Sequence, residues 1–306
     1  MIESEVAIVG AGPAGLVTAL QLRRYRIPAV IFEERDPGGL LLNANLVENY
    51  PGFPQGIPGI ELARLFIEQA HNAGVGLTYE RVLAVKFEGG VFNIRTEHES
   101  YQARVLVIAA GTQPKPFPEQ MLAGVDMTRV NYEFFPLRHI EACRIAIIGA
   151  GDAAFDYALS FASRGNQVII LHRSEELRCL PLLWERASAN ERISCRSSTW
   201  IEKICSTNGS ELRLDCETNA GKTSLVVNYL VGALGRTPRM ELLSSLPDAD
   251  GLQAEGRLHI VGDIHHGIYR QTAIAVGDGL RAAMKIYERL KGDSSVAALP
   301  QNNKTI

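Results

Sequence analysis

The sequence predicts an α/β protein made of two similar domains, with the second inserted into the first. Three observations support this fold class. A G-x-G-x-x-G motif follows an apolar run at positions 10–15, and a related G-x-G-x-x-A motif follows another at 149–154. Proline-rich and glycine-rich connections, at 113–118 and 232–238, separate the second motif from the sequence around it. A glycine turn between a buried strand and a helix is typical of the Rossmann-like unit that binds a dinucleotide.

The first glycine motif begins where a short buried strand, 6–9, is expected to end. Gly10 permits the sharp turn, Gly12 lets the backbone approach a pyrophosphate, and Gly15 lets helix and strand pack closely. The N-terminus of the following helix offers free N–H groups to the phosphates. The next apolar run ends at Glu33, an acid placed to accept a hydrogen bond from a ribose hydroxyl. These features favour a dinucleotide site over a glycine-rich turn of another kind.

Between the two motifs, turn residues, helical periodicity and alternation indicate one loop, one helix and three strands. They are expected at 47–54 for the loop, 58–74 for the helix, and 81–88, 91–96 and 105–112 for the strands, the last of which ends in small residues.

The second motif lies between a strand at 144–148 and a helix that ends near Arg164. The strand after that helix, 168–171, is not followed by an acid. Arg173 and Arg178 come there instead, and arginine can pair with a 2′-phosphate that a carboxylate would repel. The sequence therefore predicts NADPH rather than NADH, although a solvated basic loop is the alternative.

The C-terminal third predicts strands and a final helix. The strands are expected at 200–206, 211–218, 224–234 and 258–262, and the helical pattern runs from Tyr269 to about Leu290. The first domain would comprise 1–113 and 239–306, and the insert 114–238. Two dinucleotide domains in one chain imply that electrons pass between two bound cofactors.

The composition argues against a nucleic-acid-binding or membrane protein. The 306 residues carry a net charge of −3, and no run of 18 apolar residues occurs. Five cysteines without C-x-x-C spacing predict a reduced, cytoplasmic protein. His265 and His266 lack neighbouring carboxylate or cysteine partners, so no metal site is expected.

The chain resembles low-molecular-weight thioredoxin reductases over nearly its whole length. Seven motifs occur in the order found in that family. They are G-A-G-P-A-G at 10–15, V-E-N-Y-P-G-F-P at 47–54, A-A-G-T at 109–112, G-A-G-D-A-A at 149–154, H-R-x-x-x-x-R at 172–178, G-D at 262–263 and Y-R-Q at 269–271.

The resemblance implies FAD in the first domain, NADPH in the insert, and a homodimer. By motif, Glu33 would bind the adenosine ribose, Asp263 the ribitol chain, and Asn49 would lie near the flavin. The residues implied for FAD are Gly10, Gly12, Pro13, Ala14, Glu33, Gly39, Leu40, Asn49, Val82, Ala110, Gly111, Gly262, Asp263, Arg270, Gln271 and Thr272. Those implied for NADPH are Gly149, Gly151, Asp152, Ala153, Ala154, His172, Arg173 and Arg178.

One departure from the family bears on the reaction. Thioredoxin reductases carry a C-x-x-C dithiol shortly before the second glycine motif, and 130–138 of this chain contains no cysteine. Tyr132 and Phe135, with Phe134 between them, would either shield a flavin face or pack at a hinge. Glu133 is a candidate proton donor or a solvated acid, and Cys179, next to Arg178, is a candidate redox thiol or a structural one.

The leading hypothesis is an NADPH-dependent FAD oxidoreductase that passes electrons to a protein carrier such as ferredoxin or flavodoxin without a dithiol relay. A second hypothesis keeps disulfide chemistry, through an unconventional cysteine or an external dithiol partner. A third is a flavoprotein subunit that binds nucleotides without catalysis.

Overall fold

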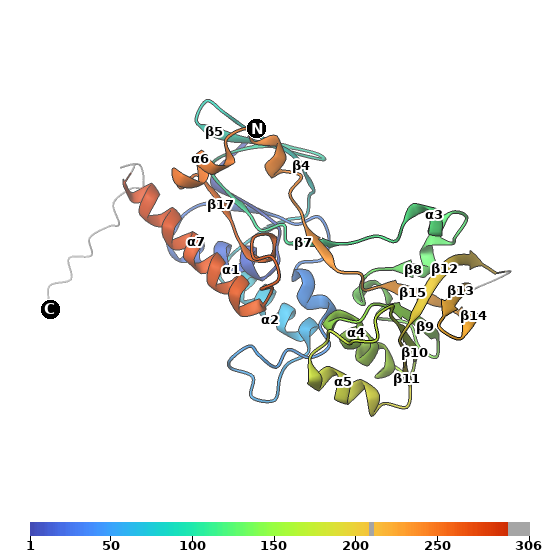
Figure 1. The fold of residues 1–306 in the computed structure, drawn as a ribbon. Coiled ribbons are helices and arrows are strands. Elements are labelled where there is room, and N and C mark those ends of the chain that lie inside the picture. The colour runs from blue at the N-terminus through green and yellow to red at the C-terminus, as the bar shows by residue number, and fades with distance from the viewer. Residues whose placement is uncertain (208–210, 293–306) are drawn as a thin grey trace. The chain divides into compact units, whose positions relative to one another are not determined.

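The computed structural model describes residues 1–207 and 211–292, which form two compact units (Figure 1). The first unit comprises Met1–Leu41, Glu61–Thr112 and the described part of Pro238–Ile306. The second comprises Leu42–Ile60 and Gln113–Thr237, apart from the three undescribed residues. The segment Leu42–Ile60 thus belongs to the second unit, whereas the sequence assigned it to the first domain.

A seven-stranded sheet forms the centre of the first unit. Its order is β3-β2-β1-β6-β5-β4, and β17 pairs with the C-terminal half of β6, where β5 no longer does. The strands are β1 (Ile2–Val9), β2 (Ala29–Phe32), β3 (Leu77–Thr78), β4 (Val82–Glu88), β5 (Val91–Thr96), β6 (Ser100–Ile108) and β17 (Leu258–Ile260). β1, β2, β3, β6 and β17 pair in parallel, and β4 and β5 form the expected hairpin.

Both faces of this sheet are buried. Val6 and Ile8 of β1 pack into the cluster that contains helix residues, while Ala7 and Val9 face a second cluster on the other side. Because side chains alternate along a strand, a continuous apolar run is what a doubly covered strand requires. The helices of this unit are α1 (Pro13–Arg24), α2 (Gly59–Asn72), α6 (Ala249–Ala254) and α7 (Thr272–Gly292), with short turns η1 (Gly39–Asn43), η4 (Leu243–Ser245) and η5 (Gly262–Ile264).

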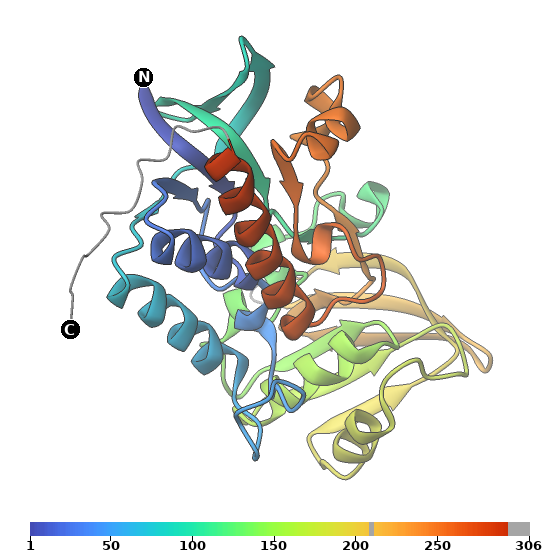
Figure 2. The same ribbon diagram turned by 90° about the vertical axis from the view of Figure 1, so that its left-hand side faces the viewer.

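Helices α1 and α7 lie side by side at very short range (Figure 2). A Cβ built on Gly279 of α7 would lie 2.3 Å from the carbonyl oxygen of Ala14 in α1. The Thr18 hydroxyl donates to the carbonyls of Ala14 (2.8 Å) and Gly279 (3.2 Å). The contact is therefore between backbones, and it holds the N-terminal helix against the C-terminal one.

The second unit repeats the parallel arrangement, in the order β11-β10-β9-β15-β8, and adds an antiparallel sheet, β12-β13-β14. The strands are β8 (Val130–Asn131), β9 (Arg144–Ile148), β10 (Gln167–Leu171), β11 (Ile193–Arg196), β12 (Thr199–Ser206), β13 (Leu212–Thr218), β14 (Gly221–Val227) and β15 (Tyr229–Gly232). The helices are α3 (Glu119–Leu122), α4 (Asp152–Ala162) and α5 (Pro181–Ser188), with turns η2 (Met127–Arg129) and η3 (Phe135–Leu137). Two further strands, β7 (Thr112–Pro114) and β16 (Arg236–Pro238), pair with each other.

The prediction of one strand over 224–234 is wrong. The chain leaves the antiparallel sheet at the end of β14 and enters the parallel sheet as β15. Asn228 marks the break, where its N–H donates to the carbonyl of Arg144 and its side-chain oxygen accepts the Arg144 N–H. An apolar run alone does not show such a change of sheet, because both strands are buried.

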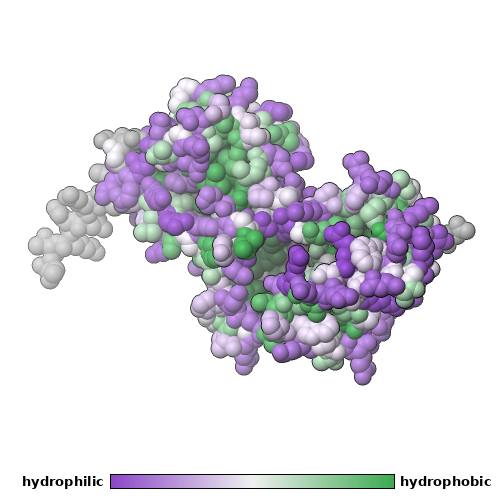
Figure 3. All heavy atoms as spheres, in the orientation of Figure 1, coloured by the Kyte–Doolittle hydropathy of each residue, from purple (hydrophilic) through white to green (hydrophobic). Residues whose placement is uncertain are grey.

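The face of the molecule in Figure 3 carries hydrophilic side chains over much of its area, with smaller hydrophobic areas between them. Among the described residues, no helix is long and apolar enough to cross a membrane.

Candidate dinucleotide sites

The first glycine turn requires glycine at two positions. Gly10 has φ +103°, and a Cβ there would lie 2.4 Å from the carbonyl oxygen of Ala109. A Cβ on Gly15 would lie 1.9 Å from the carbonyl oxygen of Gly10. Both clashes are with backbone atoms: relieving the first would separate the turn from the segment after β6, and relieving the second would open the turn between β1 and α1.

The N-terminus of α1 is not capped by a side chain. The helix starts with Pro13, and its N-cap, Gly12, makes no side-chain capping hydrogen bond. A Cβ built on Gly39 would lie 3.2 Å from the Cα of Gly12, so two glycine backbones meet in front of this helix. The first N–H groups of a helix lack intrahelical partners and attract phosphates. The residues present therefore fit a pyrophosphate.

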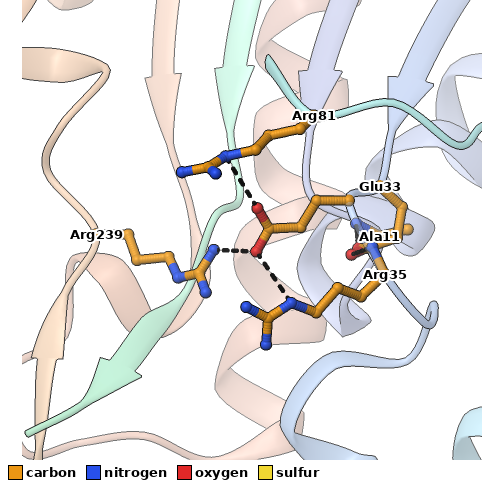
Figure 4. A network of polar contacts seen from close by, with 6 residues as sticks. Ala11, Glu33, Arg35, Arg81 and Arg239 are labelled. Atoms are coloured by element: carbon orange, nitrogen blue, oxygen red, sulfur yellow. Dashed lines mark hydrogen bonds and ion pairs between the residues drawn. The ribbon is translucent and has the colours of Figure 1, made fainter. Parts of the chain in front are cut away.

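Glu33, at the end of β2, is bound to the same turn. One carboxylate oxygen accepts the Ala11 N–H at 2.8 Å, and the other accepts the Arg35 N–H at 3.0 Å. These two bonds fix the carboxylate beside the glycine motif (Figure 4).

The next residue, Glu34, pairs with three arginines, Arg35, Arg81 and Arg239, which are labelled in Figure 4. Its carboxylate lies 2.6 Å from Arg239, 3.5 Å from Arg81 and 3.8 Å from Arg35. Partial burial alone would raise the pKa of Glu34, but the hydrogen bond and charge of Arg239, with the charges of the other two arginines, lower it. The cluster thus joins the end of β2 to the segments that carry Arg81 and Arg239.

A second group of polar contacts organises the segment before α7. Gly262 has φ +77°, and its N–H donates to the Asp278 carboxylate at 3.2 Å. Asp278 is buried and also bonds His266 and, at 2.7 Å, Arg281. Helix α7 begins at Thr272, three residues later than the sequence pattern suggested. The buried Nε of Arg270 has no hydrogen-bond partner within the described residues, so it is a donor that a ligand can use.

Several other residues implied for FAD lie on separate elements of the two units. Leu40 follows Gly39 in η1, Val82 begins β4, and Ala110 and Gly111 follow β6. Asn49 belongs to the second unit, because its loop lies in Leu42–Ile60.

Three polar contacts hold that loop within the second unit. The Asn43 side chain accepts the Phe135 N–H at 2.9 Å, and the Asn45 N–H donates to Asp156 of α4 at 2.8 Å. Glu48 makes a two-pronged ion pair with Arg186 of α5, at 2.6 and 2.9 Å. No pattern in the sequence indicates these bonds, since their partners lie far along the chain.

Replacing Asp156 by asparagine is expected to stabilise the protein at neutral pH. Burial raises the pKa of Asp156 from 3.8 to about 6, opposed by the Asn45 hydrogen bond and aided by the Asp152 charge. Because the pKa of this carboxyl is higher in the folded protein, the protonated group contributes its full stabilisation below about pH 4. That contribution is lost as the pH rises through about 6 and the buried group becomes charged. D156N keeps an acceptor oxygen without the charge, so the free energy of unfolding at pH 7.5 should rise by roughly 1–3 kcal/mol. Urea unfolding of both proteins measures this, and a difference that does not shrink below about pH 5 would contradict it.

The second glycine turn is built like the first. Gly151 caps α4 without a side-chain hydrogen bond. Arg178 returns to the turn, because its N–H donates to the Ala150 carbonyl at 2.9 Å and it forms a bridge with Gly151. The Asp152 carboxylate accepts the Leu180 N–H at 2.7 Å. The structure thus brings the arginine segment to the glycine turn, and an uncapped helix N-terminus beside arginine fits a phosphate-bearing nucleotide.

Within that segment, the arginines and His172 differ. The side chains of Arg173 and Arg178 are exposed. His172 is only 5% exposed, and both ring nitrogens are engaged, Nδ1 by the Ser174 carbonyl at 2.6 Å and Nε2 by the Cys195 sulfur at 3.3 Å. The structure therefore gives His172 a role inside the protein, whereas the resemblance implied contact with the nucleotide.

The segment that replaces the dithiol is packed against the second unit. The Tyr132 hydroxyl accepts the Phe117 N–H at 3.1 Å, and the two rings lie 5.6 Å apart. Glu133 pairs with Arg236 at 2.8 Å, and neither side chain is more than a quarter exposed. These contacts favour hinge packing for Tyr132, and they give Glu133 an ion-pair partner.

The two phenylalanines of this segment behave differently. Phe134 is buried against Phe161, with ring centroids 5.0 Å apart. Phe135 is partly exposed and lies under the Arg138 guanidinium, 3.8 Å from ring centroid to cation.

All five cysteines lie in the second unit, and none is in a disulfide. Burial raises the pKa of the Cys179 and Cys216 thiols, and raises that of Cys195 to about 11. The thiolate is the nucleophile in disulfide exchange, so these three thiols are poorly suited to that reaction.

Comparisons with known proteins agree with this geometry. The family model described as pyridine nucleotide-disulphide oxidoreductase matches residues 4–288. The thioredoxin reductase of Mycolicibacterium smegmatis is 32% identical over 92% of this chain and 94% of its own length. The bifunctional thioredoxin reductase/thioredoxin of Mycobacterium leprae is also 32% identical over 92% of this chain. That protein is longer, and the match covers 64% of its length.

Solved structures show the same fold. Lactococcus lactis thioredoxin reductase in its FR conformation superposes with a TM-score of 0.82 at 26% identity, covering 94% of this chain and 99% of that one. The crystal structure of T. acidophilum thioredoxin reductase gives a TM-score of 0.81 at 24% identity, covering 95% of this chain and 100% of that one. The predicted fold class, two Rossmann-like domains with one inserted in the other, is confirmed. The chain therefore belongs to the pyridine nucleotide-disulphide oxidoreductase family, and it is an NAD(P)H-dependent flavoprotein oxidoreductase that uses FAD and NADPH.

Proposed function

We propose that this protein transfers electrons from NADPH through FAD to a disulfide that belongs to a separate molecule, such as a thioredoxin-like protein. The observation that carries the proposal is the absence of a dithiol in this chain. The segment 130–138, where the family carries its C-x-x-C pair, contains no cysteine, and none of the five cysteines is in a disulfide. The disulfide that accepts electrons from the flavin is then supplied by another molecule.

In this proposal the first unit binds FAD and the second binds NADPH. The Gly10–Gly12 turn and the α1 N-terminus hold the FAD pyrophosphate, and Glu33 holds the adenosine ribose. Asp263 holds the ribitol chain, and Arg270 donates to the isoalloxazine through its available Nε. When bound, FAD supplies hydride acceptance from NADPH and delivery of two electrons to a disulfide.

In the second unit, Gly151 and the N-terminus of α4 hold the NADPH pyrophosphate. Arg173 and Arg178 pair with its 2′-phosphate, which distinguishes NADPH from NADH. These roles follow the family motifs, and the return of Arg178 to the glycine turn supports them.

The relatives reported above are disulfide reductases, which favours a disulfide over the ferredoxin or flavodoxin acceptor that the sequence first suggested. Among the disulfide mechanisms, an external dithiol is favoured over an unconventional cysteine. Cys179 was the candidate, but burial raises the pKa of its thiol, which leaves less of it as thiolate at neutral pH.

The test is an anaerobic titration. The purified FAD-loaded protein is reduced with NADPH, and oxidised thioredoxin, ferredoxin or flavodoxin is added in turn while flavin absorbance is followed. The proposal expects NADPH to bleach the flavin and thioredoxin disulfide to restore its colour. Restoration by a one-electron carrier alone would contradict the disulfide assignment, and absence of bleaching would favour the non-catalytic hypothesis.

The Cys179→Ser variant is expected to keep the full rate of disulfide turnover, because the proposed electron path does not pass through Cys179. The measurement is steady-state NADPH oxidation with oxidised thioredoxin as acceptor. A Cys205→Ser variant is the matched control, since it changes a thiol of β12 that accepts a weak hydrogen bond from the Arg213 side chain of β13. Loss of turnover in C179S but not in C205S would return catalysis to this chain's own thiol.

We further propose a homodimer, as the family resemblance implied, in the cytoplasm, as the cysteine content predicted. Sedimentation equilibrium of the FAD-loaded protein distinguishes a dimer from a monomer.

A further inference from the structure

A thiol and an imidazole lie beneath the arginine segment of the second unit, and the proposed function uses neither. His172 follows β10 and Cys195 lies in β11, one strand further from the glycine turn. Cys195 is the register partner of Ile170, two residues before His172, so both side chains point to the same face of the sheet. The Cys195 sulfur lies 3.3 Å from Nε2 of His172, which is hydrogen-bonding distance for sulfur.

The partners of His172 define which atoms carry the protons. The Ser174 carbonyl can only accept, so Nδ1, 2.6 Å away, carries the ring proton. In a neutral ring Nε2 is then an acceptor, and the Cys195 thiol must be the donor. Burial raises the pKa of Cys195 to about 11, which keeps its proton in place at neutral pH. The thiol therefore acts as a stable hydrogen-bond donor rather than as a nucleophile.

The backbone and the ring of His172 together fix the start of the arginine segment. The backbone N–H of His172 donates to the Arg196 carbonyl at 3.1 Å, and the backbone carbonyl of His172 accepts the Thr199 N–H at 3.1 Å. The bond from Nδ1 to Ser174 closes a tight turn around Arg173, and Glu176 N–H donates to the Ser174 hydroxyl at 3.0 Å. The far end of the segment is held separately, at Arg178, by the glycine turn.

We infer that Cys195 is a positioning residue for coenzyme specificity: its thiol orients His172, and His172 holds the turn that aims Arg173 at a 2′-phosphate. The inference rests on the proposed binding of NADPH by this segment. Without the thiol, the buried Nε2 loses its donor, and the ring is oriented only by its bond from Nδ1 to the Ser174 carbonyl, which weakens its hold on the turn. Contacts of the rest of the nucleotide, at Gly151 and the α4 N-terminus, do not depend on this turn.

The experiment measures binding of two adenine nucleotides by calorimetry, so it does not depend on flavin chemistry. The probe 2′,5′-ADP carries the 2′-phosphate, and 5′-AMP lacks it. With the FAD-loaded protein, C195A should weaken 2′,5′-ADP binding by about tenfold, the effect of losing one charge-assisted contact, and leave 5′-AMP binding unchanged. C195S, which retains a donor at the same position, should restore most of the affinity. C205A, which removes a thiol from β12, is the matched control and should bind both nucleotides as the unaltered protein does.

Two results would overturn the inference. One is equal weakening of both nucleotides by C195A, which would indicate a general packing role. The other is normal 2′,5′-ADP binding by C195A. If C195A does not fold, C195V fills the site without a donor and gives the same comparison. An unaltered protein that binds both nucleotides equally well would instead contradict the NADPH assignment, so the two failures are distinguishable.

Discussion

Replacing Gly15 by alanine is expected to abolish FAD binding. The added Cβ would lie 1.9 Å from the Gly10 carbonyl oxygen, where no side chain can yield. To accommodate it, α1 must move away from β1, which displaces the helix N-terminus proposed to hold the pyrophosphate. The purified variant should carry less than about a tenth of the flavin of the unaltered protein, as overpacking at a backbone contact costs several kcal/mol. The ratio of flavin to protein absorbance measures this.

The matched control is Gly277→Ala. Gly277 lies in α7, and a Cβ built there meets no atom within 4 Å. Since alanine favours a helix more than glycine does, G277A should retain flavin and melt at the same or a higher temperature. A G15A protein that is purified with a full complement of FAD would contradict the assignment of this turn to the cofactor.

The double replacement of Arg173 and Arg178 by alanine is expected to reverse the coenzyme preference. Each arginine lost from a charged hydrogen bond to phosphate costs about 1.5–3 kcal/mol, so kcat/KM for NADPH should fall at least about a hundredfold. The value for NADH should change little, because NADH has no 2′-phosphate for these side chains to bind. Steady-state rates with each coenzyme, at one fixed salt concentration, measure both effects.

Arg192→Ala is the control for this pair. Arg192 precedes β11, and its backbone carbonyl accepts the Val168 N–H at the start of β10. Arg173 follows the other end of β10, so the two arginines lie at opposite ends of this strand. The removal of Arg192 takes a positive charge from the same unit without touching the arginine segment. Equal losses for NADPH and NADH in the double variant would contradict the 2′-phosphate assignment, whatever the control shows.

The glycine turns could be predicted because their information is local. A turn that needs φ +103° at Gly10, next to a helix that approaches it at Gly15, leaves a fixed spacing in the sequence. The strands before each turn are apolar throughout, and β1 shows why, since it is covered on both faces. The fold class follows from these signals alone.

The contacts that sequence reasoning missed join residues whose spacing carries no pattern. The motif around His172 indicated the residue types of a nucleotide site, but the ring is held by Cys195, 23 residues later on another strand. The loop with Asn49 was expected in the first domain, yet Glu48 pairs with Arg186, 138 residues away in the second unit. The basic cluster around Glu34 likewise depends on Arg239, 205 residues away. Such pairs are set by the tertiary fold, and a single sequence does not show which distant residues the fold brings into contact.

The backbone contact between α1 and α7 also sets an order of events during synthesis. The hydrogen bond from Thr18 to Gly279 spans 261 residues, so the first glycine turn leaves the ribosome long before the helix that supports it. The second unit ends at Thr237 and has no need of α7 to complete its own sheets. A nascent chain stopped before α7 would then contain every strand of the second unit, while its first unit would lack the helix that packs on α1. The first glycine turn therefore reaches its final packing only after the second unit has been synthesised.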